Sequence, residues 1–164
     1  MRKWFYPVAA AAAVICLVML DQLTKYLAVR GSFDDVVIIP GVFELSYIRN
    51  EGAAFGILQQ KTLFFIVFTI LMLVLLILLY LRIPLEKGYG WIRFSLILII
   101  SGACGNLIDR IWHGYVIDFL YFSLIDFPVF NVADSYVVCG VFLFILLYIV
   151  QHDKLDHLLE KKET

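Results

Sequence analysis

The sequence predicts a mostly α-helical integral membrane protein with four transmembrane helices, built as a single domain over residues 1–164. Hydrophobic residues make up 63% of the chain and charged residues only 16%, whereas soluble domains carry about 45–50% and about 25%. A chain of this size buries only about 70% of its surface on folding, so lipid must cover part of the rest. The apolar residues are also gathered into four long runs.

The same composition excludes several other classes of protein. Disordered chains have low hydrophobicity, and a net charge of −1 provides no basic excess for binding nucleic acid. Cys16, Cys104 and Cys139 lie far apart inside apolar runs and form no CxxC motif. We therefore expect packing or lipid-facing cysteines rather than a disulfide framework or a metal site.

The first apolar run covers about residues 4–28. Arg2 and Lys3 precede it, which is also typical of a cleaved secretory signal peptide. However, no small-x-small cleavage site closes the run, and it ends in the polar sequence Asp-Gln-Leu-Thr-Lys at residues 21–25. We therefore expect it to be retained as the first transmembrane helix.

Three further apolar runs cover about residues 62–81, 91–108 and 134–150. The clearest is Thr62–Leu81, which carries no charge and lies between Lys61 and Arg82. Twenty helical residues span about 30 Å, which is the thickness of the hydrocarbon core. In the third run Arg93 can extend its side chain to the nearer interface.

The distribution of lysine and arginine predicts the orientation, because cytoplasmic loops carry an excess of these residues. With both termini in the cytoplasm, the inside holds eight cations: Arg2, Lys3, Arg82, Lys87, Arg93, Lys154, Lys161 and Lys162. The outside then holds four: Arg30, Arg49, Lys61 and Arg110.

Two segments are then extracytoplasmic. Val36–Ile39 and Val42–Ile48 are β-branched and aromatic runs separated by Pro40-Gly41, which predicts a small β element. Tyr115–Phe122 is rich in aromatic residues, so we expect a loop at the membrane interface.

Polar residues at membrane depth are costly, and each is therefore a candidate for a functional site. Asp21 lies about 24 Å above the start of the first span at 1.5 Å per residue. In the predicted topology the other polar residues of the spans lie near the same extracytoplasmic surface, as do two in the loops on that side. The full set is Asp21, Lys25, Asn50, Asn106, Asp109, Arg110, Asp118, Asn131 and Asp134.

Purely structural interpretations exist for several of these residues. Asp21 and Lys25 are spaced i, i+4 and can simply pair. Asn131 can cap a helix that has Asp134 at its third position. Asp109 and Arg110 can be ordinary interfacial charges, although the small residues of 102–106 before them predict close helix packing. The histidines are divided between the two sides of the membrane, so we expect no metal site and no cofactor.

The chemistry that fits these residues best is that of two aspartates acting on one water. An ionised carboxylate can serve as general base while a protonated one donates to the substrate carbonyl, provided that their pKa values differ. Asp118 lies between Ile117 and Phe119, and Asp134 begins an apolar helix. The sequence contains no GxSxG or HExxH motif. A pair of Ser135 and Lys25 is possible, but no motif supports it.

Five blocks of the sequence resemble the type II, or lipoprotein, signal peptidases of bacteria. In the order of that family they are Asp21–Lys25 (DQLTK), Arg49–Phe55 (RNEGAAF), Gly102–Arg110 (GACGNLIDR), Val116–Phe119 (VIDF) and Phe130–Asp134 (FNVAD). One block alone would be weak evidence for the family, whereas five blocks in the order of that family are highly specific for it.

The resemblance implies a membrane aspartic endopeptidase that removes signal peptides from prolipoproteins. Its substrate would carry diacylglycerol on a cysteine, and cleavage would fall just N-terminal to that cysteine. The enzyme would lie in the bacterial cytoplasmic membrane among phospholipids, with its active site at the extracytoplasmic face, and we infer no obligate protein partner. Asp118 and Asp134 would be catalytic, surrounded by a shell of residues: Asp21, Lys25, Asn50, Gly52, Asn106, Asp109, Arg110 and Asn131.

The main rival hypothesis is a small proton- or ion-coupled transporter, in which membrane carboxylates relay ions. Transporters tend to hold their binding site near the midplane, whereas the ionisable residues here crowd one face. A structural subunit, whose polar residues only lock helices together, is a third hypothesis and would tolerate Asp118→Asn.

Overall fold

The computed structural model describes residues 2–31, 36–52, 61–86 and 88–160, with side chains described for residues 6–31, 36–52, 61–86 and 88–151. Residues 53–55 of the second motif lie outside the described residues. So do Lys87, Lys161 and Lys162 and the side chains of Arg2, Lys3 and Lys154, which entered the count of charges.

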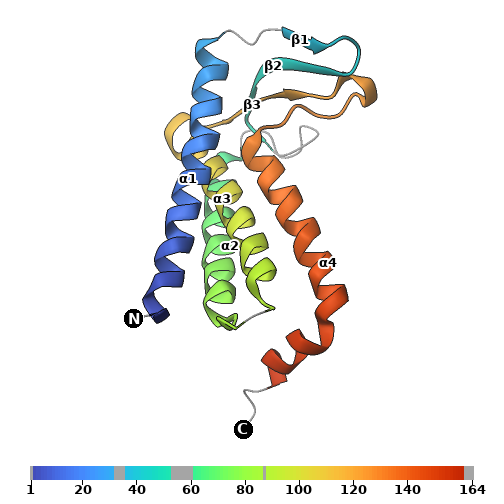
Figure 1. Cartoon of the computed structure of the whole chain (residues 1–164). Coiled ribbons are helices and arrows are strands. Elements are labelled where there is room, and N and C mark those ends of the chain that lie inside the picture. The colour runs from blue at the N-terminus through green and yellow to red at the C-terminus, as the bar shows by residue number, and fades with distance from the viewer. Residues whose placement is uncertain (1, 32–35, 53–60, 87, 161–164) are drawn as a thin grey trace.

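Four long helices form the body of the molecule (Figure 1): α1 (Arg2–Arg30), α2 (Thr62–Arg82), α3 (Gly90–His113) and α4 (Val132–Glu160). Each contains a stretch that is long and apolar enough to cross a membrane, namely Tyr6–Arg30, Thr62–Arg82, Gly90–His113 and Val132–Gln151. The predicted class, a helical membrane protein with four spans, is therefore confirmed.

The helices extend beyond the predicted spans because hydropathy marks only their apolar part. Helix α3 continues past Ile108 through Asp109 and Arg110 to His113, and it ends at Gly114 in the left-handed conformation (φ 83°), whose N–H donates to the carbonyl of Arg110. Helix α4 bends at Gln151 (φ −125°, ψ 23°), where its apolar span also ends.

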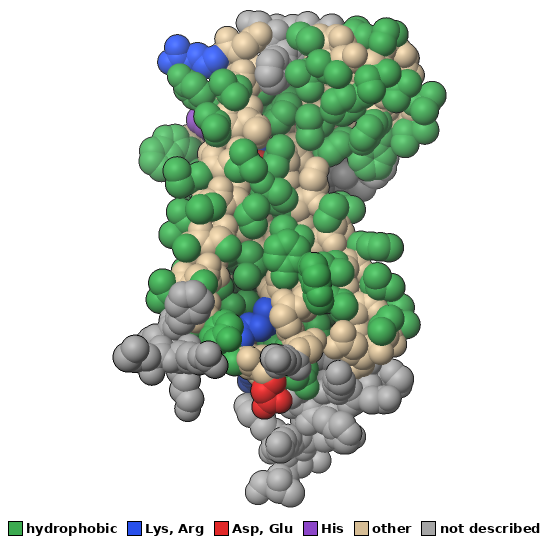
Figure 2. Space-filling view, viewed as in Figure 1, with side chains coloured by type: hydrophobic (Ala, Val, Ile, Leu, Met, Phe, Trp, Pro, Cys, Tyr) green, Lys and Arg blue, Asp and Glu red, His purple; other side chains and the backbone are tan. Residues whose placement is uncertain are grey.

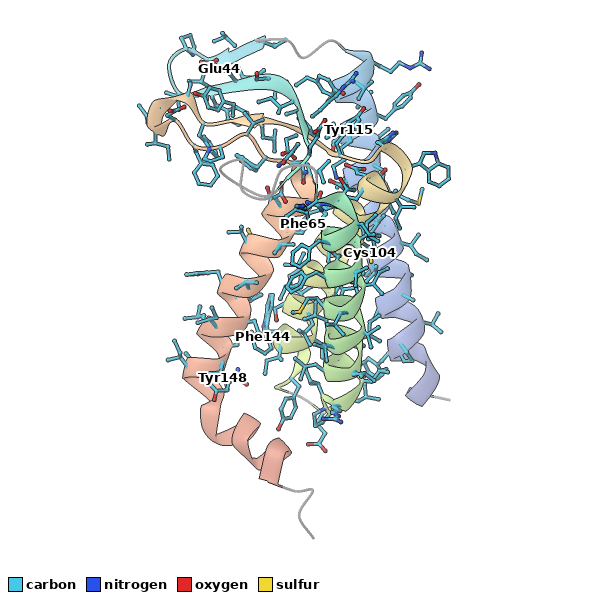
Figure 3. The ribbon with its side chains drawn as sticks, turned by 180° about the vertical axis from the view of Figure 1, so that it is seen from behind. Glu44, Phe65, Cys104, Tyr115, Phe144 and Tyr148 are labelled. Carbon is cyan, nitrogen blue, oxygen red and sulfur yellow. The ribbon has the colours of Figure 1, made fainter. Side chains whose placement is uncertain are left out.

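Helix α3 lies at the centre of the bundle and packs against α1, α2 and α4. The main apolar core gathers Ala10, Leu73, Ile92, Leu96 and Ile100, and Phe144 of α4 points toward it (Figure 3). By contrast, most of α2 is exposed, with Leu73 and Tyr80 as its buried residues. The flank of the bundle is largely hydrophobic in Figure 2, as a surface in contact with lipid requires.

Glycines allow α3 and α4 to approach closely. A Cβ at Gly102 would overlap the carbonyl oxygen of Ala133, which confirms the close packing predicted for residues 102–106. A Cβ at Gly140 of α4 would lie 2.7 Å from Cγ1 of Ile99 and 2.9 Å from the carbonyl oxygen of Ser95. Backbone atoms therefore face both glycines, and a side chain can be fitted only by moving a helix.

We expect Gly140→Ala to destabilise the protein by about 1–3 kcal/mol, because overpacking of a close contact carries a penalty of this size. The control is Gly90→Ala, since a Cβ at Gly90 meets nothing within 4 Å. Thermal unfolding in detergent should show a lower midpoint for Gly140→Ala only. Equal midpoints for the two variants would contradict the packing described above.

A three-stranded antiparallel sheet covers one end of the bundle, with strand order β1 (Val36–Ile39), β2 (Phe43–Asn50) and β3 (Val116–Tyr121) (Figure 1). The predicted small β element is present as β1 and β2. The segment Tyr115–Phe122, expected as an interfacial loop, contributes β3. Residues Val116–Phe119 are all buried, because β3 pairs with β2 and also packs against α1 and α3. A strand that is buried throughout lacks the alternation of apolar and polar residues that marks a strand in sequence.

Candidate active site

The polar residues predicted to form a site lie together at the end of the bundle beneath the sheet. All ten are described, and an unbroken series of hydrogen bonds and ion pairs connects them. They come from α1, from the end of β2 and the residues just after it, from α3, from β3, and from the first turn of α4 and the residue before it. The site can therefore form only when all these elements have packed together.

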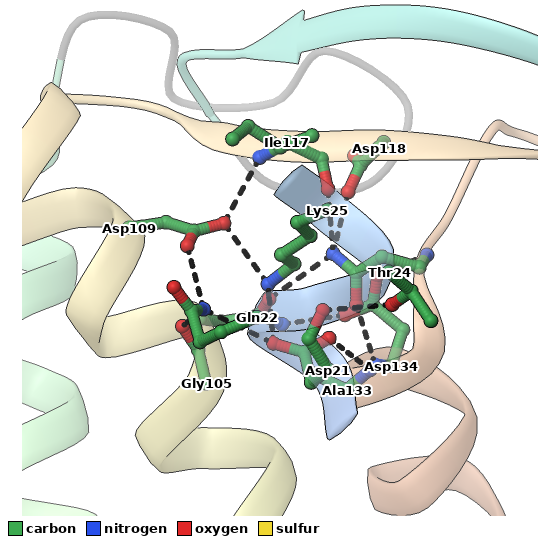
Figure 4. Close-up of polar contacts among 12 residues, drawn as sticks. Asp21, Gln22, Thr24, Lys25, Gly105, Asp109, Ile117, Asp118, Ala133 and Asp134 are labelled. Atoms are coloured by element: carbon green, nitrogen blue, oxygen red, sulfur yellow. Dashed lines mark hydrogen bonds and ion pairs between the residues drawn. The ribbon is translucent and has the colours of Figure 1, made fainter. Parts of the chain in front are cut away.

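Lys25 of α1 lies at the centre of this network and is only 1% exposed. Its Nζ atom is 2.9 Å from each of three acceptors: Oδ2 of Asp21, Oδ2 of Asp109 and Oδ1 of Asn106 (Figure 4). An ammonium group has three N–H donors, so each can be paired. The i, i+4 pair with Asp21 is present, but Lys25 also joins α1 to α3.

Asp21 connects α1 to the start of α4 as well. Its Oδ1 accepts the backbone N–H of Ala133 at 2.9 Å, and this N–H is one of those at a helix N-terminus that lack an acceptor within the helix. Gln22 adds a link that the sequence did not single out, since its Nε2 donates to Oδ1 of Asp109 at 2.9 Å. Its place inside the first motif was the only sequence signal for this role.

Asn131 and Asp134 form a reciprocal cap on α4. The N–H of Asp134 donates to Oδ1 of Asn131 at 2.9 Å, and the N–H of Asn131 donates to Oδ2 of Asp134 at 3.1 Å. The capping interpretation is therefore confirmed, but it is incomplete. Nδ2 of the same Asn131 donates to Oδ1 of Asp118 at 2.7 Å, so one asparagine bonds both carboxylates.

Each of the two carboxylates accepts two N–H groups. Asp118 also accepts Nδ2 of Asn50, through Oδ2 at 2.8 Å, and Asp134 also accepts Nδ2 of Asn106, through Oδ1 at 2.7 Å. Asp118 is 2% exposed, whereas Asp134 is half-buried. Fixed amides thus hold a buried carboxylate from β3 beside a more accessible one from α4.

The pKa of Asp118 is raised from 3.8 to about 7. Burial is the largest cause, because it disfavours the charged form, and the negative charge of Asp134 raises the pKa further. The hydrogen bonds from Asn50 and Asn131 oppose this rise. Near neutral pH such a pair can hold one proton, and it then offers an acid and a base side by side.

Arg110 and Gly52 hold the end of β2 beside the carboxylates. The N–H of Gly52 donates to Oδ1 of Asn50 at 3.0 Å, and Nη2 of Arg110 donates to the carbonyl of Gly52 at 3.3 Å. The Arg110 guanidinium also lies 5.0 Å from the ring centre of Phe65, at the end of α2 nearest the sheet (Figure 3). Arg110 is thus a half-buried part of the site rather than an ordinary interfacial charge.

Comparison with known proteins gives a consistent result. The family model described as signal peptidase (SPase) II matches residues 13–150. A protein named "Lipoprotein signal peptidase" from Streptococcus thermophilus (strain CNRZ 1066) is 47% identical over 149 residues, which cover 90% of this chain and 94% of that protein. One of the same name from Caldanaerobacter subterraneus subsp. tengcongensis is 47% identical over 137 residues, covering 80% of this chain and 89% of that one.

Two solved structures share the fold, and both are described as bacterial membrane enzymes studied by the in meso method. The match to the first has a TM-score of 0.79 at 32% identity and covers 95% of this chain and 93% of that chain. The match to the second has a TM-score of 0.73 at 34% identity and covers 84% of this chain and 90% of that chain. By its family model, its relatives and its fold, this chain belongs to the signal peptidase II family.

Proposed function

We propose that Asp118 and Asp134 are the catalytic pair of this aspartic peptidase. The observation that carries the proposal is that one residue, Asn131, bonds both carboxylates. The raised pKa of Asp118, caused mainly by burial, is consistent with it. The substrate is a prolipoprotein with diacylglycerol on a cysteine, and the bond cleaved is the one N-terminal to that cysteine. The relatives named "Lipoprotein signal peptidase" support this choice of substrate.

In the proposed reaction the ionised aspartate takes a proton from a water molecule, and the water oxygen attacks the scissile carbonyl carbon. The protonated aspartate donates its proton to the carbonyl oxygen, which would otherwise gain charge. The aspartate that took the proton from water then gives it to the leaving nitrogen, and the C–N bond of the tetrahedral intermediate breaks. The carbonyl re-forms as its hydroxyl proton returns to the other aspartate. This releases the signal peptide and the new amino terminus on the lipidated cysteine.

The other site residues have positioning roles in this proposal. Asn50, Asn106 and Asn131 orient the carboxylates through the hydrogen bonds given above. Asp21, Lys25 and Asp109 fix α1 against α3 and α4. Arg110 and Gly52 hold the end of β2 over the pair.

We further propose that both termini lie in the cytoplasm of a bacterium and that the site faces the extracytoplasmic side of its cytoplasmic membrane. The site lies at the end of the bundle far from the amino terminus (Figure 1). The distribution of lysine and arginine along the sequence predicts that this terminus is cytoplasmic. A substrate with an apolar signal helix and a lipidated cysteine would present its scissile bond near that surface. The midplane location expected of a transporter site is not found among the described residues.

The function is tested with the full-length protein in detergent and a diacylglyceryl-modified precursor. Mass spectrometry should show release of the signal peptide and a product that begins at the lipidated cysteine. The same precursor without lipid should be cleaved far more slowly. Equal rates on both precursors, or cleavage at another bond, would contradict the proposed substrate. Loss of activity with a chelator would contradict a reaction carried by the aspartates alone.

The raised pKa of Asp118 also predicts a pH dependence. Activity should fall as the pH rises through about 7, because the pair then loses its remaining proton and has no acid left. Nδ2 of Asn50 stabilises the ionised form of Asp118 and so lowers its pKa. Asn50→Ala should therefore move the alkaline limb of the kcat/KM profile to higher pH.

The control for this pH prediction is Arg49→Gln, the exposed neighbour of Asn50 on β2. It should leave the alkaline limb of the profile in place. A limb that stays unchanged in Asn50→Ala, or that moves to lower pH, would show that Asp118 does not control it.

A further inference from the structure

A cavity of about 550 Å³ opens at the end of the bundle opposite the catalytic pair. It lies between the start of α1, the end of α2, the connection between α2 and α3, and the first turns of α3. Tyr6 in its wall precedes Asp21 by fifteen residues of the same helix, which corresponds to about 22 Å. The cavity is therefore separate from the peptidase site.

Arg93 supplies a positive charge to this cavity. Its guanidinium carbon lies 4.7 Å from the ring centre of Tyr80 and 5.7 Å from that of Tyr6, and its Nη2 donates to the hydroxyl of Tyr80 at 3.1 Å. Two aromatic rings thus hold the group in one place. A guanidinium has five N–H donors arranged to bind phosphate oxygens in pairs, so further donors remain for a ligand at the cavity.

Much of the remaining lining of the cavity is apolar. It includes Ala9 and Ala10 of α1 and Phe94 and Ile97 of α3, and the alanine side chains are short. At the rim Trp91 is 63% exposed, and tryptophan is enriched where a membrane meets water. A phospholipid fits this arrangement, because its acyl chain can fill the apolar slot while its phosphate binds the fixed cation at the level of the membrane interface.

Glu86 adds a negative charge at the same rim. It is exposed, and no ion pair joins it to Arg93, although the structure describes both residues. In Figure 2 a positive and a negative side chain lie near the lower end of the molecule, below a largely hydrophobic flank. This pattern of charges complements a headgroup that carries both a phosphate and a primary amine.

We propose that this cavity binds one molecule of phosphatidylethanolamine from the leaflet on the side of the amino terminus. Arg93 binds the phosphate, Glu86 accepts the amine, and an acyl chain lies between α1 and α3. In the topology proposed above this is the cytoplasmic leaflet. The site is independent of the peptidase function, because it lies at the other end of the bundle.

The test is native mass spectrometry of the full-length protein, released from detergent after titration with phosphatidylethanolamine. The wild type should retain one lipid molecule. Arg93→Gln should need about a tenfold higher lipid concentration for the same retention, because a charged hydrogen bond to the phosphate is lost. The matched control is Arg82→Gln, which removes an exposed cation at the same end of α2 but outside the cavity. Inorganic phosphate should not displace the lipid, because it cannot fill the apolar slot.

A second pair of variants separates binding from folding, since Arg93→Gln also disturbs two tyrosine contacts. Ala9→Phe fills the slot and leaves those contacts in place, whereas Val8→Phe adds the same ring at the neighbouring position, which is 65% exposed and does not line the cavity. Lipid retention should fall for Ala9→Phe only. Retention at the wild-type level in both Arg93→Gln and Ala9→Phe would overturn the proposal. Losses of the same size in the controls Arg82→Gln and Val8→Phe would also overturn it.

The headgroup is tested with phosphatidylglycerol, which has the phosphate but no amine. The wild type should bind it more weakly than phosphatidylethanolamine, and Glu86→Gln should remove this preference. Equal binding of the two lipids by the wild type would overturn the assignment of Glu86 to the amine.

Discussion

Asp118→Asn and Asp134→Asn are each expected to reduce cleavage of a lipid-modified precursor by about 10²–10⁴-fold, the contribution usual for a positioned acid or base. An asparagine fills the same volume and can still accept a hydrogen bond, from Asn131 at position 118 or from Asn106 at position 134. It can neither take a proton from water nor deliver one to the substrate. The loss should therefore appear in kcat, measured by the rate of product formation at saturating substrate.

The control for this pair is Asp126→Asn. Asp126 is an exposed aspartate after β3 in the left-handed conformation (φ 49°), which asparagine also adopts readily. The hydroxyl of Tyr121 donates to its Oδ1 at 2.7 Å, and an asparagine amide oxygen keeps that acceptor. Activity should stay close to the wild-type rate. If either catalytic variant unfolds at the wild-type temperature and still cleaves at the wild-type rate, the catalytic pair is wrongly assigned.

The second large effect is expected from Lys25→Met. The change removes the ammonium group that lies between Asp21 and Asp109, both of which are 0% exposed. Breaking a buried ion pair by deleting one partner typically destabilises a protein by about 3–5 kcal/mol, because an unpaired charge is left buried. In Lys25→Met two buried carboxylates, those of Asp21 and Asp109, would be left without their cation. Denaturant unfolding in detergent should show this loss, and activity should fall with the folded fraction.

Two comparisons isolate the cause of that loss. Lys61→Met removes an exposed lysine just before α2 and should leave stability unchanged within about 0.5 kcal/mol, as is usual for surface positions. Adding Asp109→Asn to Lys25→Met should restore part of the stability, because one of the two buried charges is then removed. A stable Lys25→Met protein would show that the ion pairs do not hold α1 in place.

The helices, the first strand pair and the identity of the polar residues can all be predicted from the amino-acid sequence. Apolar runs such as 62–81 can satisfy their backbone only as helices in lipid, so length and hydropathy alone indicate the four spans. The aromatic and β-branched runs on either side of Pro40-Gly41 likewise predict β1 and β2 from local pattern. A polar side chain at membrane depth, such as Asp21, stands out against these apolar runs wherever it occurs.

The contacts that those polar residues make depend on the tertiary structure. Asn50 meets Asp118 across 68 residues of sequence, and Asp21 meets the N–H of Ala133 across 112. Such contacts depend on how helices and strands pack, which no local pattern contains. For the same reason β3 is recognised as a strand only through its pairing with β2. Asn131, which the sequence marks as a helix cap, also joins the two aspartates in the folded protein.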